Sequence, residues 1–252
     1  MLGYYSKLST EVYGVDKPIG TSFGDVEFYL ERLAGIKGRI LEPATGTGRM
    51  LVPLLERKFM VDGFDSSLDM LNMCSKNCEA RGLRPNLFKA DMETFSLGTE
   101  YEAVIIPAGT FLLLHERGAS LRALKNFHRH LKPGGKLIVD LYLPTDNEIG
   151  NSTLRSWEVE DGGVITLEST TTDIDHINQF SVSNHRYEKW ERGQLLDTEL
   201  ERFAMRWYGV EEFRTILENH GFGDIVISAD YVYGEYPKNP QQSITFEAVA
   251  KK

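Results

Sequence analysis

The feature that most constrains the fold is a regular alternation of short β-branched runs and longer helical stretches between residues 36 and 141. The short runs have the composition of buried strands, and the stretches between them repeat apolar residues at helical spacing. Strands joined by helical crossovers pair in parallel. We therefore predict an α/β fold on a doubly wound, mostly parallel sheet of seven strands. The predicted strands of this region are Arg39 to Glu42, Val61 to Phe64, Asn86 to Ala90, Ala103 to Ile106 and Lys136 to Leu141.

The pattern changes after Leu141, where residues 146–207 become rich in Thr, Val, Ile and aromatic residues punctuated by Gly and Asp. Such punctuation is typical of hairpins, so we predict an inserted antiparallel β-meander of about four strands. A helix over Val210 to His220 and strands over Asp224 to Ala229 and Ser243 to Ala250 then complete the sheet. We predict that residues 1–252 form one domain, in which residues 1–35 are a flexible N-terminal arm and a helix.

Charge and composition limit the classes of partner that we expect for this chain. The 252 residues carry 37 Asp plus Glu against 28 Lys plus Arg, a net charge of -9 that disfavours nucleic acid, and we expect a small-molecule partner. The longest apolar stretch, Ala103 to Leu114, is interrupted and too short for a bilayer, and the first residues lack the features of a secretory signal. We therefore expect a cytoplasmic protein without membrane contact, either a monomer or a homodimer. Cys74 and Cys78 are expected to be packed, reduced thiols, and no metal site is expected.

A Gly-rich turn follows the first predicted strand and leads into a helix. It reads Glu42-Pro43-Ala44-Thr45-Gly46-Thr47-Gly48, and its glycines allow a ligand to approach the backbone closely. Dinucleotide-binding turns have a similar form, but here Leu51 replaces the helical glycine of that motif. Glu42 would also place negative charge beside the amides that receive a pyrophosphate. The turn therefore favours a cationic ligand.

Carboxylates also end the next two strands. Asp65, followed by Ser66, ends the second strand, and Asp91 with Met92 follows the third. A carboxylate at such a strand end accepts hydrogen bonds from a ribose diol in dinucleotide folds, and ligands of open α/β sheets bind at these carboxyl ends. Asp91 would offer an acceptor to an exocyclic amine, and Met92 would pack on a purine. Each acid alone is as easily a cap or a solvated charge, but together they predict a nucleoside site.

In combination these segments resemble the class I S-adenosylmethionine-dependent methyltransferases. The resemblance covers roughly residues 38–141 and the helix from Tyr208 to Phe222. The family commonly has glycine where this chain has Ala44, and the turn remains feasible if Ala44 avoids a positive φ. The segments that carry the resemblance are Ile40 through Gly48, Gly63-Phe64-Asp65-Ser66 through Met70-Leu71, Ala90-Asp91-Met92 and Leu131-Lys132-Pro133-Gly134-Gly135.

The resemblance implies S-adenosyl-L-methionine as the cofactor and assigns its parts to the motifs. Glu42 and the turn would receive the methionine portion, Asp65 the ribose hydroxyls, and Asp91 with Met92 the adenine. Pro107 would lie beside the reactive sulfonium. The residues expected to bind the cofactor are Tyr13, Glu42, Ala44, Gly46, Gly48, Asp65, Ser66, Met70, Asp91, Met92 and Pro107.

The insertion resembles that of small-molecule N-methyltransferases, including sugar amine dimethyltransferases, in which the arm and the insertion cover the acceptor. We accordingly expect residues 146–207 to cover the acceptor side, with the acceptor a small molecule methylated on N or O. Substrate contacts are expected from Tyr187, Tyr231 and Tyr233. The histidine that some sugar enzymes carry after the fourth strand falls in an apolar run here, and His115 is displaced from its position.

Methyl transfer from a sulfonium is an in-line displacement, so holding the acceptor and the methyl group in line supplies most of the acceleration. A neutral amine needs no general base, whereas a hydroxyl does. The sequence assigns no catalytic residue, and Tyr13 and His185 are the weak candidates. Two alternatives remain open at this point: a nicotinamide-dependent oxidoreductase, and a non-catalytic protein that binds S-adenosylmethionine.

Overall fold

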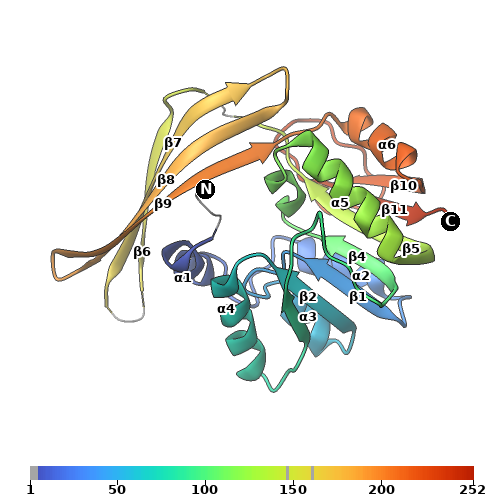
Figure 1. The fold of residues 1–252 in the computed structure, drawn as a ribbon, viewed down its shortest axis with the longest axis horizontal. Coiled ribbons are helices and arrows are strands. Elements are labelled where there is room, and N and C mark those ends of the chain that lie inside the picture. The colour runs from blue at the N-terminus through green and yellow to red at the C-terminus, as the bar shows by residue number, and fades with distance from the viewer. Residues whose placement is uncertain (1–4, 146–147, 160–161) are drawn as a thin grey trace.

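The computed structural model describes residues 5–145, 148–159 and 162–252, which fold into two sheets and the helices around them (Figure 1). Residues 1–4 of the predicted arm and residues 146, 147, 160 and 161 of the predicted insertion lie outside the described residues. The helices are α1 (Lys7–Asp16), α2 (Asp25–Leu33), α3 (Leu51–Glu56), α4 (Leu68–Glu79), the 3-10 helix η1 (Thr110–Leu113), α5 (Arg117–His130) and α6 (Val210–Asn219).

The larger sheet has seven strands in the order β10-β11-β5-β4-β1-β2-β3. The pairs among β1 to β5 are parallel, and β11 runs antiparallel to both β5 and β10, so β10 is parallel to β5. The predicted seven-stranded, mostly parallel sheet is thus confirmed. Its strands are β1 (Arg39–Pro43), β2 (Met60–Asp65), β3 (Asn86–Lys89), β4 (Tyr101–Ile106), β5 (Leu131–Leu141), β10 (Phe222–Ala229) and β11 (Ile244–Ala250).

Alternate residues of these strands enter two separate cores. In β4, Val104 and Ile106 pack with side chains of α5 and α6, while Ala103 and Ile105 pack with side chains of α2 and α3. Figure 1 shows α5 and α6 covering one face of the sheet. Because both faces are covered, the central strands contain nearly continuous apolar runs, as in Val104 to Ile106 and Leu137 to Val139.

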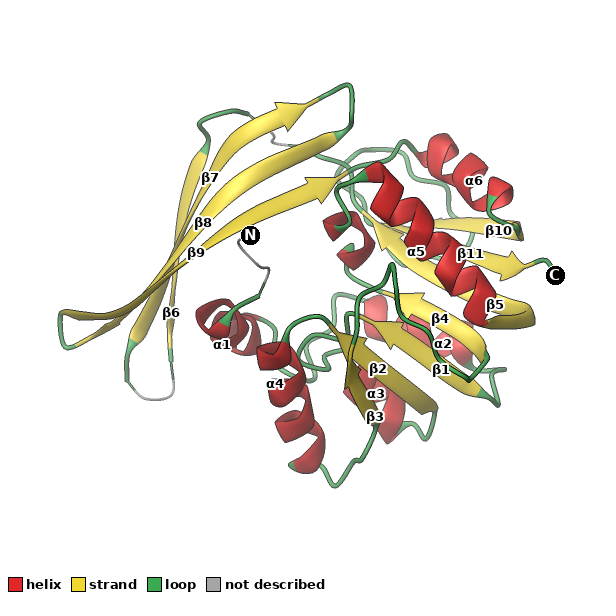
Figure 2. Cartoon of the chain, in the orientation of Figure 1, coloured by secondary structure: helices red, strands yellow, loops and turns green. Residues whose placement is uncertain are grey.

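The inserted meander forms a second sheet, here called sheet B, with four antiparallel strands in the order β6-β7-β8-β9. Figure 2 shows sheet B as a layer of its own beside the larger sheet. The predicted antiparallel insertion is confirmed, with boundaries shifted by a few residues. Its strands are β6 (Ser152–Glu158), β7 (Val164–Asp175), β8 (Phe180–Glu191) and β9 (Gln194–Arg206).

The predicted flexible arm is wrong for residues 7–16, which form α1 against sheet B. Two carboxylates of β9 accept hydrogen bonds from its first turn: Glu199 from the Leu8 amide at 2.7 Å and Glu201 from the Ser9 hydroxyl at 2.6 Å. Negative charge at a helix N-terminus is stabilising. The sequence of α1 contains Gly14 and has no acidic residue in its first turn, which weakened the helix signal, although Leu8, Val12 and Val15 repeat at helical spacing.

The turn after β1 contains an alanine in a backbone conformation that favours glycine. Ala44 has φ 51°, so the expectation that it avoids a positive φ is wrong. The turn is nevertheless held, because the Thr45 amide donates to the Phe64 carbonyl at 3.0 Å and the Gly46 amide donates to Asp65 at 2.9 Å. The tips of β1 and β2 therefore impose the left-handed conformation on Ala44.

Replacement of this alanine by glycine should raise stability. A left-handed alanine costs about 1 to 2 kcal/mol, and Ala→Gly costs about 0.4 to 1 kcal/mol through the unfolded chain. The Ala44→Gly variant should therefore gain about 0.5 to 1 kcal/mol in the free energy of unfolding, measured by urea titration. Ala80→Gly is the matched control, since Ala80 is exposed and right-handed with φ -59°, and it should lose stability. Equal losses in both variants would contradict the strain at Ala44.

Candidate active site

A pocket of about 420 Å³ opens at the carboxyl ends of β1, β2 and β3. This is where ligands of open α/β sheets bind. The arm contributes Tyr5 and Tyr13, while the segment from η1 to α5 contributes Thr110, His115 and Glu116. Most of the residues predicted from the sequence to bind the cofactor come together on its wall: Tyr13, Ala44, Gly46, Asp65, Ser66, Met70, Asp91 and Met92.

Asp65 lies at the tip of β2 and joins two backbone segments. Its carboxylate accepts the Gly46 amide at 2.9 Å and the Ser67 amide at 2.8 Å. Burial raises the pKa of Asp65, and these backbone hydrogen bonds oppose the rise. The side chain is 6% exposed and lines the pocket, so its carboxylate offers acceptor capacity at the pocket wall.

Glu42 precedes the Gly-rich turn and is 2% exposed. Burial raises its pKa to about 8, against the opposing effects of Thr45 and Arg49. Among the described residues, its Oε2 is buried and has no hydrogen-bond partner. A buried acceptor without a partner is costly, and a cationic donor would satisfy it. Three residues that the sequence predicted to bind the cofactor are not among the pocket-lining residues: Glu42, Gly48 and Pro107.

Asp91 and Met92 follow β3 and lie on the pocket wall. The Asp91 carbonyl accepts the amides of Thr94 and Phe95 at 3.1 and 3.0 Å, which forms a turn and exposes the Asp91 side chain. The carboxylates of Asp65 and Asp91 therefore stand at successive strand tips, as the sequence predicted.

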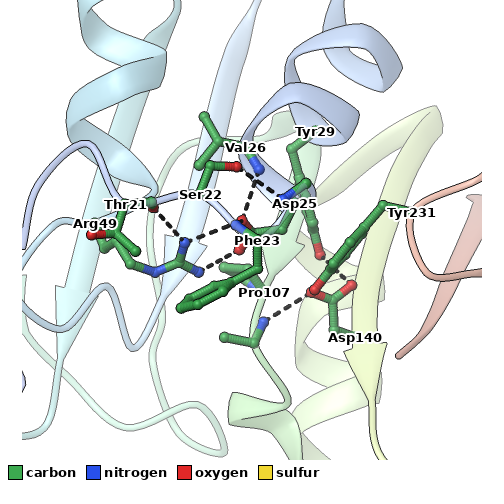
Figure 3. Close-up of polar contacts among 12 residues, drawn as sticks. Thr21, Ser22, Phe23, Asp25, Val26, Tyr29, Arg49, Pro107, Asp140 and Tyr231 are labelled. Carbon is green, nitrogen blue, oxygen red and sulfur yellow. Dashed lines mark hydrogen bonds and ion pairs between the residues drawn. The ribbon is translucent and has the colours of Figure 1, made fainter. Parts of the chain in front are cut away.

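A buried ion pair that the sequence did not indicate lies beside this pocket (Figure 3). Arg49, directly after the Gly-rich turn, pairs with Asp25 at the start of α2 and donates to the Thr21 carbonyl at 3.2 Å. Both side chains are almost fully buried. The pair thus fixes the segment before α2 to the turn, and the positive charge of Arg49 restrains the rise in the pKa of Tyr13.

The tyrosines of the arm meet at the pocket. The rings of Tyr5 and Tyr13 are edge to face, with centroids 6.1 Å apart. The Tyr5 carbonyl accepts the hydroxyl of Ser67 at 2.7 Å, and the same hydroxyl caps α4 by accepting the Met70 amide at 3.2 Å. The arm is therefore attached to the element that follows Asp65.

The remaining predicted residues lie away from the pocket lining. His185 stacks on Phe203 at 4.6 Å, and burial lowers its pKa to about 4. Tyr187 is buried with Leu8 and Val12 of α1. The residues of the loop after β10 are also engaged elsewhere: Tyr231 donates to Asp140 at 3.3 Å, as Figure 3 shows, and Tyr233 lies under the Arg32 guanidinium at 3.5 Å.

The structure instead brings His115 to the pocket, a residue that the sequence left without a role. Burial, with Arg202 and Arg206, lowers its pKa. The Arg206 Nε donates to the His115 carbonyl at 2.8 Å, which fixes the start of α5 to β9. In the sequence, His115 follows an apolar run, which gave no indication of a site residue there. In the structure, η1 and the residues after it bring His115 to the pocket.

Comparisons with known proteins agree with this geometry. Residues 40–135 match a family model described as a methyltransferase domain. The methyltransferase YqeM of Bacillus subtilis (strain 168) is 29% identical over 223 residues, which cover 86% of this chain and 85% of that protein.

Solved structures share the complete fold. A S-adenosylmethionine-dependent methyltransferase from Clostridium acetobutylicum ATCC 824 superposes with a TM-score of 0.77 at 16% identity, over 96% of this chain and 97% of that one. The sugar N-methyltransferase KedS8 from Streptoalloteichus sp ATCC 53650 superposes with a TM-score of 0.71 at 21% identity, over 92% and 90% of the two chains.

The matched domain includes the Gly-rich turn and both strand-tip carboxylates, which disfavours the nicotinamide alternative. None of the helices in the described residues combines the length and apolarity that a transmembrane span requires. The comparisons thus identify a methyltransferase domain over residues 40–135, and the strand order and pocket of the whole chain have the fold of S-adenosylmethionine-dependent methyltransferases.

Proposed function

We propose that this enzyme transfers a methyl group to the nitrogen of a small-molecule amine held beside the cofactor. The observation that carries the proposal is the pocket itself, whose acidic side chains Asp65, Asp91, Glu93 and Glu116 face a space closed by Tyr5 and Tyr13. His115 is the one basic side chain among the described lining residues, and its pKa is lowered. Such a wall attracts cations, which includes the protonated form of an amine, and the bound amine must release this proton to water before its nitrogen can take the methyl group.

The residues present fit the cofactor. The unpartnered Glu42 Oε2 suits the ammonium group of the methionine portion, and Asp65 suits a ribose diol. Asp91 would accept a hydrogen bond from the adenine amine, and Met70 and Met92, which line the same pocket, would pack beside the ring. The proposed cofactor contacts are the residues that the sequence predicted: Tyr13, Glu42, Ala44, Gly46, Gly48, Asp65, Ser66, Met70, Asp91, Met92 and Pro107.

When bound, S-adenosylmethionine supplies an electrophilic methyl group, and the protein need not supply a nucleophile. The chain's own task is to align the acceptor nitrogen with that methyl group and to exclude water. Tyr5 and Tyr13 close the arm side of the pocket, while Thr110 and His115 form the opposite wall. Sheet B packs against α1, and α1 carries Tyr13 of the pocket wall. This packing supports the proposal that residues 146–207 cover the acceptor side.

The N-methylation proposal also draws on the sugar N-methyltransferase among the structures that share this fold. A cytoplasmic address, and a monomer or homodimer, remain part of the proposal. The two cysteines, free and buried in the structure, support a reducing compartment.

The test is turnover of methyl-labelled cofactor on matched pairs of small molecules, each an amine and the alcohol of the same carbon skeleton. We expect label on amines only. Label only on alcohols would contradict the proposal, and tight binding of S-adenosylhomocysteine with no turnover on any pair would favour the non-catalytic alternative.

The pKa of Glu42 leads to a pH dependence of cofactor binding. Since burial raises this pKa to about 8, the carboxyl is largely protonated at neutral pH and must lose its proton to pair with an ammonium group. The affinity for S-adenosylhomocysteine should therefore rise about 20-fold from roughly pH 6.5 to 8.5, measured by calorimetry. Glu42→Gln should flatten this dependence, whereas Glu79→Gln, at an exposed position, should keep it. A flat wild-type profile would contradict the role of Glu42.

Removal of the Asp65 carboxylate should weaken cofactor binding directly. Asp65→Ala should lower the affinity for S-adenosylhomocysteine by about 1 to 3 kcal/mol, because charge-assisted hydrogen bonds to the ribose are lost. Asp69→Ala is the control, since Asp69 is exposed one turn further along and does not line this pocket. An unchanged dissociation constant in folded Asp65→Ala would remove this residue from the site.

A further inference from the structure

Asp140 is a carboxylate buried in β5 that accepts hydrogen bonds from four segments of the chain, and Figure 3 shows it beside two of its partners, Tyr29 and Tyr231. Its Oδ1 accepts the hydroxyls of Tyr29 at 3.0 Å and Thr245 at 2.7 Å. Its Oδ2 accepts the Ala108 amide at 2.9 Å and the Tyr231 hydroxyl at 3.3 Å. The sequence places this acid in an apolar strand, and the contacts above are its structural partners.

One of these partners is the tip of β4. Ala108 and Gly109 both have a positive φ, at 57° and 69°, and a Cβ on Gly109 would overlap the Tyr142 ring. The Thr110 amide and hydroxyl both donate to the Pro107 carbonyl, at 3.2 and 2.9 Å. This tight turn leads into η1, and Thr110 lies on the wall of the active-site pocket.

A left-handed alanine persists only where its surroundings fix it. The Asp140 carboxylate is one such constraint, because a backbone N–H cannot rotate toward a different acceptor, unlike the hydroxyls that share the carboxylate. Burial raises the pKa of Asp140 to about 6, and the hydrogen bonds from Thr245, Ala108 and Tyr29 oppose the rise, so the group is largely ionised at neutral pH. A charged acceptor makes a stronger hydrogen bond than a neutral one.

We propose that Asp140 is a positioning residue for methyl transfer, which acts by holding the Ala108 amide and thereby fixing the pocket wall at Thr110. Asp140 is absent from the pocket lining and does not touch the reacting groups. Its effect is therefore on alignment rather than on cofactor affinity. The inference rests on the proposed function and extends it to a residue one layer behind the site.

The first test needs no turnover. In Asp140→Ala, the Thr110 amide should exchange with deuterium about tenfold faster than in the wild type, because the turn that protects it loosens. Thr245→Val is the matched control, since it removes a hydrogen bond to the same carboxylate but leaves the Ala108 contact. Wild-type exchange at Thr110 is expected in this control. Equal exchange in both variants would overturn the proposal.

The second test separates alignment from general loss of stability. With an amine acceptor, Asp140→Ala should lower kcat about tenfold or more, while the dissociation constant of S-adenosylhomocysteine changes less than about threefold. Asp140→Asn should recover most of kcat, because its amide oxygen still accepts the Ala108 N–H and the hydroxyls can rotate to accept from its NH₂. Thr245→Val should keep kcat even where its melting temperature falls. Wild-type kcat in Asp140→Ala would overturn the proposal.

If Asp140→Ala does not fold, Asp140→Leu removes the acceptor of the Ala108 N–H while an apolar side chain of similar volume fills its place in the strand. The same increase in exchange at Thr110 is then expected, and unchanged exchange would overturn the proposal. A wild-type enzyme that methylates no acceptor would contradict the proposed function, while the exchange comparison would still decide the role of Asp140.

Discussion

The cofactor side of the molecule depends on the hydrogen bonds that one carboxylate accepts from two separate segments. Asp65 binds the amide of Gly46 in the turn after β1 and the amide of Ser67 at the start of α4. Ser67 in turn caps α4 and binds the carbonyl of Tyr5. The Asp65 carboxylate therefore links the Gly-rich turn, α4 and, through Ser67, the arm by hydrogen bonds. A ligand that bonds to this carboxylate acts on all three at once.

The buried acids at and near the pocket share a second property: their interactions do not fully offset the free-energy cost of burying a carboxylate. Burial raises the pKa values of Glu42, Asp65 and Asp140, and among the described residues none of the three forms an ion pair with a cationic side chain. Asp25 shows the contrast, because Arg49 lowers its pKa despite burial. The fold thus places acidic groups beside the pocket at a desolvation cost to their charged forms, and a cationic ligand reduces that cost.

The sequence predicted the parallel sheet, the antiparallel insertion and the strand-tip carboxylates, since each depends on local periodicity or on the rule that parallel strands end at one edge. It did not predict α1, whose stability comes from Glu199 and Glu201 almost 200 residues away. It also missed the Asp25 and Arg49 pair and the partners of Asp140, which are contacts between distant segments. An acid inside the apolar run Leu137 to Leu141 was the available signal for Asp140. Nothing in the sequence indicated the strained backbone at Ala44, because the residue type alone does not determine φ.

The separation of the two sheets affects how such an enzyme can diversify. The strands of sheet B pair only with one another, and among the described residues they contact the rest of the chain chiefly through α1, η1 and the ends of β8 and β9. If sheet B covers the acceptor as proposed, substitutions on its face toward α1 can therefore reshape the acceptor side without entering either core of the parallel sheet. Under the proposed function, new acceptors are accessible through changes in one layer, while the layer that recognises the cofactor keeps its geometry.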